Sequence, residues 1–552
     1  MGVGIPRFAR NDSLHGIHIF ALIFTAILLL HAPLLRLPYY WDEAGYYIPA
    51  AYDFFTHGYL IPHSVPSNAH PPLPAIYLAM WWKLSAFKPS VTRIAMLVVA
   101  AFALSAVFLL ARKVANGRVA FAVLLCTAIY PVWFAQSSLA HADLPAAALL
   151  LCALYFYFRS LLGKAFDAKA TEPVVISKEL AIEETRTSHR DVVWAAVLFA
   201  LAALAKETAI VTPLVLAGYD MVQQIRSRAK RNLWRPILLV LSALPLAAWF
   251  AYHRARTGFV FGNPEFFAYN VAGTLTPLRF ALSFALRLWQ IFGYMNFWVL
   301  TLATIWVMRY PPQPDSKGGS RPRIPLAVQY RISVVILANI LLFSAVGGAA
   351  LARYLLPMYP LAILIGVSTL WRRLPNWEYV IALALAGFVL ALFSNPFGYI
   401  PPEDNLSYRN YVILHKEAAD YLTQHDAHAT VLTAWTATDE LTKPFLGYVH
   451  KPMQVVRIED FSLPHIERAR EREDYDFALL FSTKQEPSGS LLDRWPWWER
   501  MSRKYFGFHR DLPPELAAQL LSGRIVWERH RGQQWAAILG FDRVQNASNL
   551  LP

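Results

Sequence analysis

The stretch "IHIFALIFTAILLLHAPLLRLPYYWDEAGYYIPAA", residues 17–51, begins with a long apolar run and then carries two adjacent carboxylates, Asp42 and Glu43. About 20 apolar residues in a helix match the roughly 30 Å of hydrocarbon in a bilayer. Arg7 and Arg10 precede the run, and no small-residue cleavage site follows it. We therefore expect a retained membrane anchor, with the two acids where the chain leaves the membrane.

The composition of the whole chain is that of a membrane protein. Of its 552 residues 56% are hydrophobic, 14% are aromatic and only 16% are charged, and the mean hydropathy is +0.34. Further apolar runs predict a polytopic α-helical membrane domain with about 11 transmembrane helices. The expected spans are 17–36, 92–111, 119–136, 144–161, 192–205, 207–222, 236–252, 280–307, 328–348, 354–371 and 378–395.

The basic residues indicate the orientation of these helices. The net charge is +14, but the basic residues are scattered through short loops and are not interleaved with aromatics on one surface, which argues against nucleic acid as a partner. Basic loops between spans lie on the cytoplasmic side. These are the N-terminus, "ARKVANGR", the linker 159–191, "QIRSRAKRNLWR", "MRYPPQPDSKGGSRPRIP" and "WRRLPNWE". We therefore expect a cytoplasmic N-terminus.

The last part of the chain differs from the rest. Residues 1–395 contain the expected spans, whereas residues 396–552 are rich in Arg, Glu and Asp and contain no run that could cross a bilayer. The helical stretch "NYVILHKEAADYLTQH" alternates with the strand-like runs "ATVLTAW", "PMQVVRI" and "DFALLFS", before the hairpin-like "GRIVWERHRGQQWAAILGF". An odd number of spans places this small α/β domain outside the cytoplasm.

The two cysteines, Cys126 and Cys152, both lie in apolar runs. We expect them to be packed in the protein or to face lipid, and not to form a disulfide or a metal site. They give no information about the redox compartment.

The predicted outer face collects short motifs with ionisable groups at helix ends. Such groups are costly near hydrocarbon and tend to be functional, although interfacial ones can snorkel to water. The motifs are "YYWDEAGYY" with Asp42 and Glu43, "HPPL" with His70, "HADLP" with Asp143, "AKET" with Lys206 and Glu207, "HRARTG" with Arg254 and Arg256, and "ARYLLP" with Arg353.

Structural explanations exist for each of these groups. Asp42 and Glu43 can interact with the dipole of a following helix or mark the edge of the membrane, and Asp143 can cap a helix. Lys206 and Glu207 can neutralise each other in a tight turn. His70 can be an ordinary interfacial histidine, and Arg353 can snorkel.

In their order along residues 15–395 these motifs resemble the membrane glycosyltransferases of the GT-C fold. The similar branch contains protein O-mannosyltransferases and the lipid A aminoarabinose transferase, which is the glycosyltransferase family 39 type. Asp42 and Glu43 match the acidic motif of the first outer loop, and "HPPL" matches a second element in the same loop. "HADLP" matches the motif before the fourth span, and "RYLLPMYP" matches a late Arg-Tyr element.

The resemblance implies an enzyme of the cell envelope in a bacterial inner (plasma) membrane. It would transfer a hexose or pentose from a polyprenyl-phosphate donor to a lipid, glycan or protein acceptor on the outer face. Some relatives have Lys where this chain has His70, and some hold a divalent metal through acidic residues that cannot be mapped here. No cofactor is assigned, and a divalent metal stays open.

The chemistry of this transfer assigns roles to the residues. Asp42, with Glu43 beside it, would accept the proton of the acceptor, because partial burial raises the pKa of a carboxylate towards the working range. Phosphate leaves without a strong acid, since its second pKa is about 6, but the departing charge must be stabilised. A one-step displacement would invert the anomeric centre.

The remaining candidates form two groups. Arginine suits phosphate because its planar guanidinium binds in a bidentate manner. The expected donor-phosphate residues are Arg353, Lys206, His70, Tyr354, Arg254 and Arg256. The expected acceptor or sugar pocket contains Tyr46, Tyr47, Asp143 and Glu207.

Two other classes of function compete with this interpretation. A transporter or lipid flippase would also have many spans and rare charges, but it usually places those charges near the membrane midplane. A scaffold with a partner-binding outer domain would not explain the acidic pair or Arg353. The charges at helix ends on one face favour the transferase.

Overall fold

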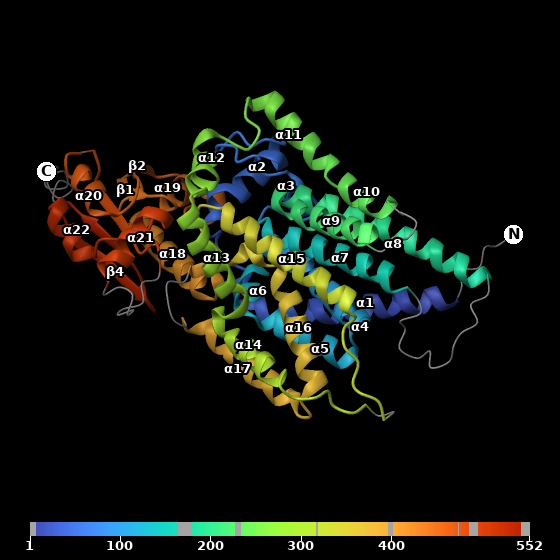
Figure 1. Ribbon diagram of the computed structural model, residues 1–552. Helices are drawn as coiled ribbons and strands as arrows, with labels where there is room; N and C mark the ends of the chain where they lie inside the picture. The colour runs from blue at the N-terminus through green and yellow to red at the C-terminus, as the bar shows by residue number, and fades with distance from the viewer. Residues whose placement is uncertain are drawn as a thin grey trace, which may run out of the picture.

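The computed structural model describes residues 7–163, 178–226, 233–315, 318–395, 401–472, 474–484 and 495–541. For 7–15 and 178–188 only the course of the backbone is described. A helical body occupies most of the molecule, and a smaller part with a sheet is attached at one end (Figure 1).

The helical body contains residues up to 395. Its first half comprises α1 (Arg7–His31), η1 (Ala32–Leu34), η2 (Glu43–Tyr47), α2 (Ile48–His57), α3 (Leu73–Leu84), α4 (Pro89–Val114), α5 (Gly117–Ile129), α6 (Pro131–Gln136), α7 (Asp143–Leu162), α8 (Lys178–Ala205), η4 (Glu207–Ile210) and α9 (Val211–Arg226). Its second half comprises α10 (Trp234–Leu241), α11 (Leu244–Thr257), α12 (Pro264–Asn270), η5 (Ala272–Thr274), α13 (Pro277–Phe292), η6 (Tyr294–Asn296), α14 (Trp298–Val307), α15 (Leu326–Ala345), η7 (Ala352–Leu355), α16 (Met358–Arg373) and α17 (Trp377–Phe393).

Five helical segments of the described chain are long and apolar enough to cross a membrane, or up to six if one bent pair forms a single span. The five are Gly16–Leu34, Pro89–Val114, Asp143–Leu162, Trp234–Thr257 and Leu326–Ala345. They correspond to five of the expected spans, and the bent pair Pro277–Asn296 and Trp298–Val307 corresponds to a sixth. The number of about 11 spans stays a prediction.

The other expected spans are interrupted or shorter for local reasons. The run 119–136 is divided between α5 and α6, because Pro131 cannot continue the hydrogen-bonding of α5. The run 280–307 bends by 98°, where Met295 and Asn296 have positive φ of 50° and 63°. The run 207–222 starts with the short turn η4.

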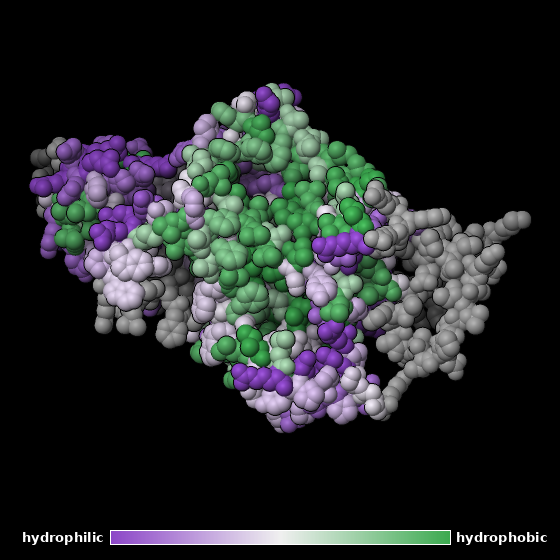
Figure 2. Space-filling model, in the orientation of Figure 1, coloured by the Kyte–Doolittle hydropathy of each residue, from purple (hydrophilic) through white to green (hydrophobic). Residues whose placement is uncertain are grey.

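Apolar side chains cover the outside of the helical body. In Figure 2 a broad hydrophobic surface lies over the helices, whereas the C-terminal part is mostly hydrophilic. Leu22 and Phe393 are 73% and 76% exposed, which is typical of contact with lipid. Cys126 and Cys152 are buried, free thiols, in agreement with the packing role expected for them.

The C-terminal part is an α/β unit with a five-stranded sheet. Its elements are η8 (Pro402–Asp404), α18 (Ser407–His425), β1 (Thr430–Ala434), α19 (Ala437–Thr442), η9 (Pro444–Leu446), β2 (Gln454–Ile458), α20 (Leu463–Arg470), β3 (Phe477–Phe481), α21 (Pro496–Phe506), α22 (Pro514–Leu521), β4 (Arg524–Arg531) and β5 (Gln534–Gly540). The strand order is β2-β1-β3-β5-β4, with β1 parallel to β2 and β3 and the hairpin β4–β5 antiparallel. The helix, the three strands and the hairpin lie where the sequence predicts them.

The C-terminal part packs directly on the segment between η1 and α2. Tyr39 donates its backbone N–H to Leu446 at 3.4 Å and accepts a hydrogen bond from the hydroxyl of Tyr448 at 2.9 Å. The ring of Trp435 lies so close to Gly45 that an added Cβ would be 2.5 Å from it. This contact requires glycine in the "WDEAG" motif.

Candidate active site

The adjacent acids Asp42 and Glu43 have different surroundings. The Glu43 side chain is fully buried and accepts hydrogen bonds from Nη2 of Arg93 at 2.8 Å and from the backbone N–H groups of Tyr40 at 2.9 Å and Ala140 at 2.6 Å. The Asp42 side chain remains 31% exposed. Glu43 therefore joins the start of η2 to α4 and to the loop before α7, whereas Asp42 keeps part of its carboxylate exposed.

Arg353 is the centre of a cluster of buried charges. It lies in η7 and is 2% exposed. Its Nη2 donates to Oδ2 of Asp42, its Nη1 is 2.5 Å from Oε2 of Glu403, and its Nε is 3.5 Å from Oδ2 of Asp143. His141 is 3.2 Å from Nη1. The guanidinium thus contacts three carboxylates from three separate segments.

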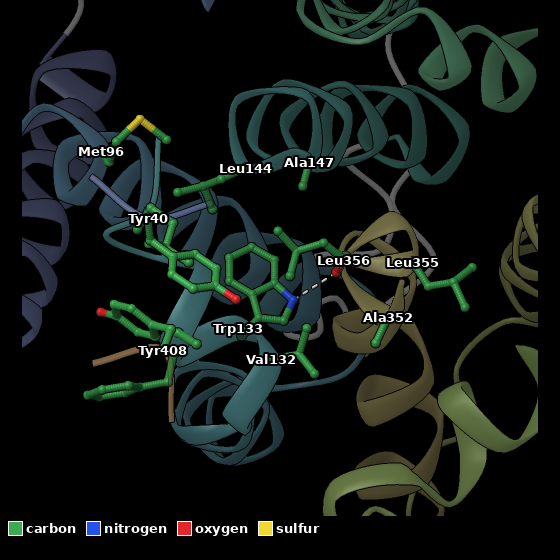
Figure 3. Packing of buried hydrophobic residues seen from close by; sticks show 14 of the residues in the cluster. Tyr40, Met96, Val132, Trp133, Leu144, Ala147, Ala352, Leu355, Leu356 and Tyr408 are labelled. Carbon is green, nitrogen blue, oxygen red and sulfur yellow. Dashed lines mark hydrogen bonds between the residues drawn. The ribbon is translucent and has the colours of Figure 1, made fainter. Parts of the chain in front are cut away.

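A hydrogen bond from α6 fixes the segment that carries Arg353. The indole N–H of Trp133, a fully buried side chain, donates to the carbonyl of Leu356 at 2.7 Å. Figure 3 shows this bond, with Trp133 pointing to the short helix that contains Ala352 and Leu355. Because a buried donor without a partner is costly, this bond holds η7 against the helical body.

Lys206 pairs with Asp143 and not with its neighbour Glu207. Its Nζ donates to Oδ1 of Asp143 and lies 4.2 Å from the ring centroid of Tyr354, a cation–π contact. Glu207 is instead 3.0 Å from Nδ1 of His70. The mutual neutralisation of Lys206 and Glu207 that the sequence suggested is therefore wrong.

Tyr46, Tyr47 and His70 line a small pocket beside this cluster. The ring of His70 lies 5.5 Å from that of Tyr46 and 6.1 Å from that of Tyr47. Tyr47 is in turn 5.7 Å from the ring of His141, which contacts Arg353. The aromatic pocket and the charged cluster are therefore continuous.

Arg254 and Arg256 lie apart from these contacts. They are in the last turn of α11, and both are exposed. Arg256 stacks over the ring of Tyr252 at 5.6 Å. Within the described chain no ion pair connects either arginine to the charged cluster, so the structure gives no support to a phosphate role for them.

The sequence did not reveal Glu403, which follows the expected membrane domain in the segment "PPED". Burial raises its pKa to about 8, and Asp42, Asp404 and Asp143 add to this effect, although Arg353 lowers the pKa. Burial also raises the pKa of Asp404 to about 7, partly offset by the hydroxyl of Tyr294. This segment has no regular spacing of apolar residues and none of the family motifs, so nothing in the sequence indicated a role for Glu403.

Arg287 is a second buried arginine that the sequence did not reveal. It lies in α13, donates to the carbonyls of Phe343 at 3.1 Å and Leu351 at 2.7 Å, and is 5.6 Å from the ring of Tyr354. Across the described chain it forms no ion pair with a carboxylate, and its Nη2 has no hydrogen-bond partner. Its position inside the expected span 280–307 concealed it, because an isolated arginine there resembles a snorkelling residue.

The described residues contain no group of three or more His, Cys, Asp or Glu side chains arranged to hold a metal ion. The carboxylates of the cluster are engaged by Arg353 and Lys206.

Comparisons with known proteins identify the fold. No family model matches the chain, and no curated protein matches it in sequence. The chain is similar to the crystal structure of ArnT from Cupriavidus metallidurans bound to undecaprenyl phosphate, with a TM-score of 0.52, 13% identity, and coverage of 96% of this chain and 98% of that chain. The apo structure of the same protein gives a TM-score of 0.51 with 14% identity over the same shares of the two chains.

An oligosaccharyltransferase from Archaeoglobus fulgidus is also similar, at a TM-score of 0.42 and 11% identity, over 86% of this chain and 70% of that chain. The likeness to ArnT covers nearly the whole of both chains, including the C-terminal part. The chain therefore has the GT-C fold that its motifs predict.

Proposed function

We propose that the protein is a membrane glycosyltransferase that moves a sugar from a polyprenyl-phosphate donor to a lipid, glycan or protein acceptor on the outer face. The ion pair between Asp42 and Arg353 carries this proposal, because a carboxylate, which can act as a base, lies next to an arginine, a residue type that binds phosphate well. The two residues are 311 positions apart in the chain, so only the fold brings them together. The likeness to a protein solved with undecaprenyl phosphate supports a lipid-phosphate donor.

Asp42 is the base in this mechanism and Glu43 is not. The exposed fraction of Asp42 leaves a carboxylate oxygen accessible to an acceptor hydroxyl, whereas hydrogen bonds from Arg93, Tyr40 and Ala140 occupy Glu43. Asp42 takes the hydroxyl proton as the oxygen attacks the anomeric carbon. The bond from that carbon to the phosphate oxygen breaks, its electron pair stays on the phosphate, and the configuration inverts.

Arg353 stabilises the negative charge that develops on the departing phosphate. Its N–H groups are directed at Asp42, Asp143 and Glu403. A donor phosphate would take over part of these contacts, which frees Asp42 to act on the acceptor. Lys206, next to Asp143, and Arg287, which has an unpaired N–H group, supply further positive charge around Tyr354.

The pocket of Tyr46, Tyr47 and His70 is suited to the sugar. Aromatic faces bind the apolar faces of sugar rings, and the His70–Glu207 pair offers polar partners at the same wall. The pocket is next to the charged cluster through Tyr47 and His141.

The proposed orientation follows the basic loops. We place the N-terminus in the cytoplasm of a bacterial cell and the C-terminal domain, residues 396–552, outside the inner membrane. The shorter apolar helices Gly117–Ile129 and Trp377–Phe393 would also cross the bilayer, towards the total of about 11 spans. The exposed side chains Leu383, Leu390 and Phe393 of α17 support this placement.

The test is sugar transfer by the purified protein in lipid nanodiscs, with synthetic polyprenyl-phosphate sugars and mixed acceptors. Asp42→Asn should lower the rate of transfer by about 10²- to 10⁴-fold, the usual contribution of a general base. Glu265→Gln, which changes an exposed carboxylate in α12, is the matched control and should keep wild-type transfer. An Asp42→Asn protein that transfers sugar as fast as the wild type would refute this mechanism.

A further inference from the structure

Glu403 connects the C-terminal domain to the charged cluster. It lies in η8, at the start of that domain, and its side chain is 4% exposed. The side-chain amide of Gln136 donates to its backbone carbonyl at 3.2 Å, which fixes η8 against α6. One carboxylate oxygen faces Arg353, and the other, Oε1, is buried and has no hydrogen-bond partner among the described residues.

The groups around Glu403 include more carboxyl groups than cations. The cations are Arg353 in η7, Lys206 just before η4, which acts through Asp143, and Arg287 in α13, which acts on Asp404. The acids are Glu403 itself, Asp42 in the first outer loop, Asp143 at the start of α7 and Asp404 next to Glu403. His141 is buried between these groups, where burial first and then Arg353 lower its pKa well below the usual value, so it adds no charge at neutral pH.

A lipid phosphate would add negative charge to a buried site that already has more carboxyl groups than cations. An uncompensated buried charge is unfavourable, and a buried carboxylate usually avoids it by binding a proton. Glu403 is the acid best suited to do so. It is almost fully buried, whereas Asp42 is partly exposed and Asp143 has the ammonium group of Lys206 as a partner. The raised pKa of Glu403 agrees with this choice.

We propose that Glu403 belongs to the donor site as a neutral carboxylic acid, which donates its O–H to an oxygen of the lipid phosphate. Arg353 then directs the N–H group that faced Glu403 to the same phosphate. Where Glu403 is ionised before binding, the complex takes up one proton from the solvent, and no covalent bond changes. The proposal rests on the proposed function for the identity of the lipid phosphate.

This role predicts how binding depends on pH. The probe is undecaprenyl phosphate, bound to the full-length protein in nanodiscs of neutral lipid. Below about pH 8 the dissociation constant should be nearly constant, and above it the constant should rise by up to tenfold per pH unit. The phosphate itself does not titrate in this range, because its second pKa is about 6. Undecaprenol, which lacks the phosphate, is the control and should show no such rise.

Glu403→Gln is the informative variant, because its amide is neutral at every pH and can still donate a hydrogen bond. It should bind undecaprenyl phosphate as tightly as the wild type at neutral pH, and its dissociation constant should stay constant as the pH rises. Glu403→Ala lacks the donor and should bind about tenfold more weakly with the same flat profile. A wild type with a flat profile, or a Glu403→Gln protein with the wild-type rise, overturns the proposal.

A second measurement needs no variant. Calorimetric titration of the wild type at about pH 9, in two buffers with different ionisation enthalpies, gives the number of protons taken up per bound lipid. We expect a value close to one, and a value of zero overturns the role of Glu403. If undecaprenyl phosphate does not bind at any pH, the proposed function fails and this proposal fails with it. Binding without proton uptake refutes Glu403 alone.

Discussion

Glu43→Gln should destabilise the protein strongly although the substitution removes no atom from the core. Glu43 and Arg93 form an ion pair in which the two side chains are 0% and 1% exposed. The amide of glutamine would place an NH₂ group against the N–H donors that now converge on the carboxylate, from Arg93, Tyr40 and Ala140. It would also leave the guanidinium of Arg93 buried without its counter-ion.

The magnitude follows from this geometry. Removing one partner of a buried ion pair costs about 3–5 kcal/mol, because the remaining charge stays buried. Folded proteins are stable by only about 5–15 kcal/mol, so the variant should lose a large part of its stability. By contrast, replacing both members of the pair with apolar residues of similar volume can be neutral. The double variant Glu43→Met with Arg93→Met should therefore be more stable than Glu43→Gln.

Thermal unfolding of the detergent-solubilised protein measures this effect. Glu43→Gln should unfold several degrees below the wild type, whereas the neighbouring Asp42→Asn should unfold within a degree or two of it, since Asp42 is partly exposed. The two variants thus separate stability from catalysis within one motif. If Glu43→Gln is as stable as the wild type, or Asp42→Asn is the less stable of the two, the assignment of roles is wrong.

Three further outcomes are expected. Asp404 has a pKa raised to about 7 by burial, so the folded protein holds a proton that the unfolded chain releases above about pH 4. The stability of the folded protein should therefore fall as the pH rises from about 4 to 7. Thermal unfolding measured across this range should show a smaller dependence on pH for Asp404→Asn than for the wild type. An equal dependence in the two proteins would contradict the burial of a protonated Asp404. Trp133→Phe removes the hydrogen bond to the carbonyl of Leu356 and should lower transfer activity about tenfold, because that bond fixes the position of Arg353. Tyr77→Phe is the control. It removes a hydrogen bond to Ala95 away from the cluster and should cause a smaller loss of activity. Gly45→Ala places a Cβ 2.5 Å from the ring of Trp435 and should weaken the packing of the C-terminal domain, which faster proteolysis of that domain would detect. Gly117→Ala is the control, because no atom lies within 4 Å of the added Cβ, and it should not change the rate of proteolysis.

The sequence was sufficient for the fold class because its apolar runs and polar motifs are local features, whereas the number of about 11 spans stays a prediction. The spacing of strand-like runs after residue 429 predicted β1, β2 and β3, and the order of four motifs pointed to a GT-C fold that the structural likeness supports. The close approach of Asp42 and Arg353 also followed from placing both motifs at helix ends on one face.

The roles within the site could not be read from local patterns. Asp42 and Glu43 are identical in charge and adjacent in sequence, and long-range contacts distinguish them: Glu43 binds Arg93, 50 residues later, whereas Asp42 binds Arg353. Glu403 lies in a short proline-rich segment without periodicity, and its significance comes from the long-range contact with Arg353. The kinks at Pro131 and Met295 shorten helices that appear continuous in a hydropathy profile.

The position of Glu403 late in the chain has a consequence for biosynthesis. While the protein is being synthesised, Asp42, Asp143 and Arg353 can meet as soon as the helices up to η7 have inserted. The last acid of the cluster arrives only after the whole membrane part has left the ribosome and η8 has docked on α6. A nascent or truncated chain that ends at residue 395 would therefore have an incomplete set of charges around Arg353, and catalysis would begin only after the two parts have joined.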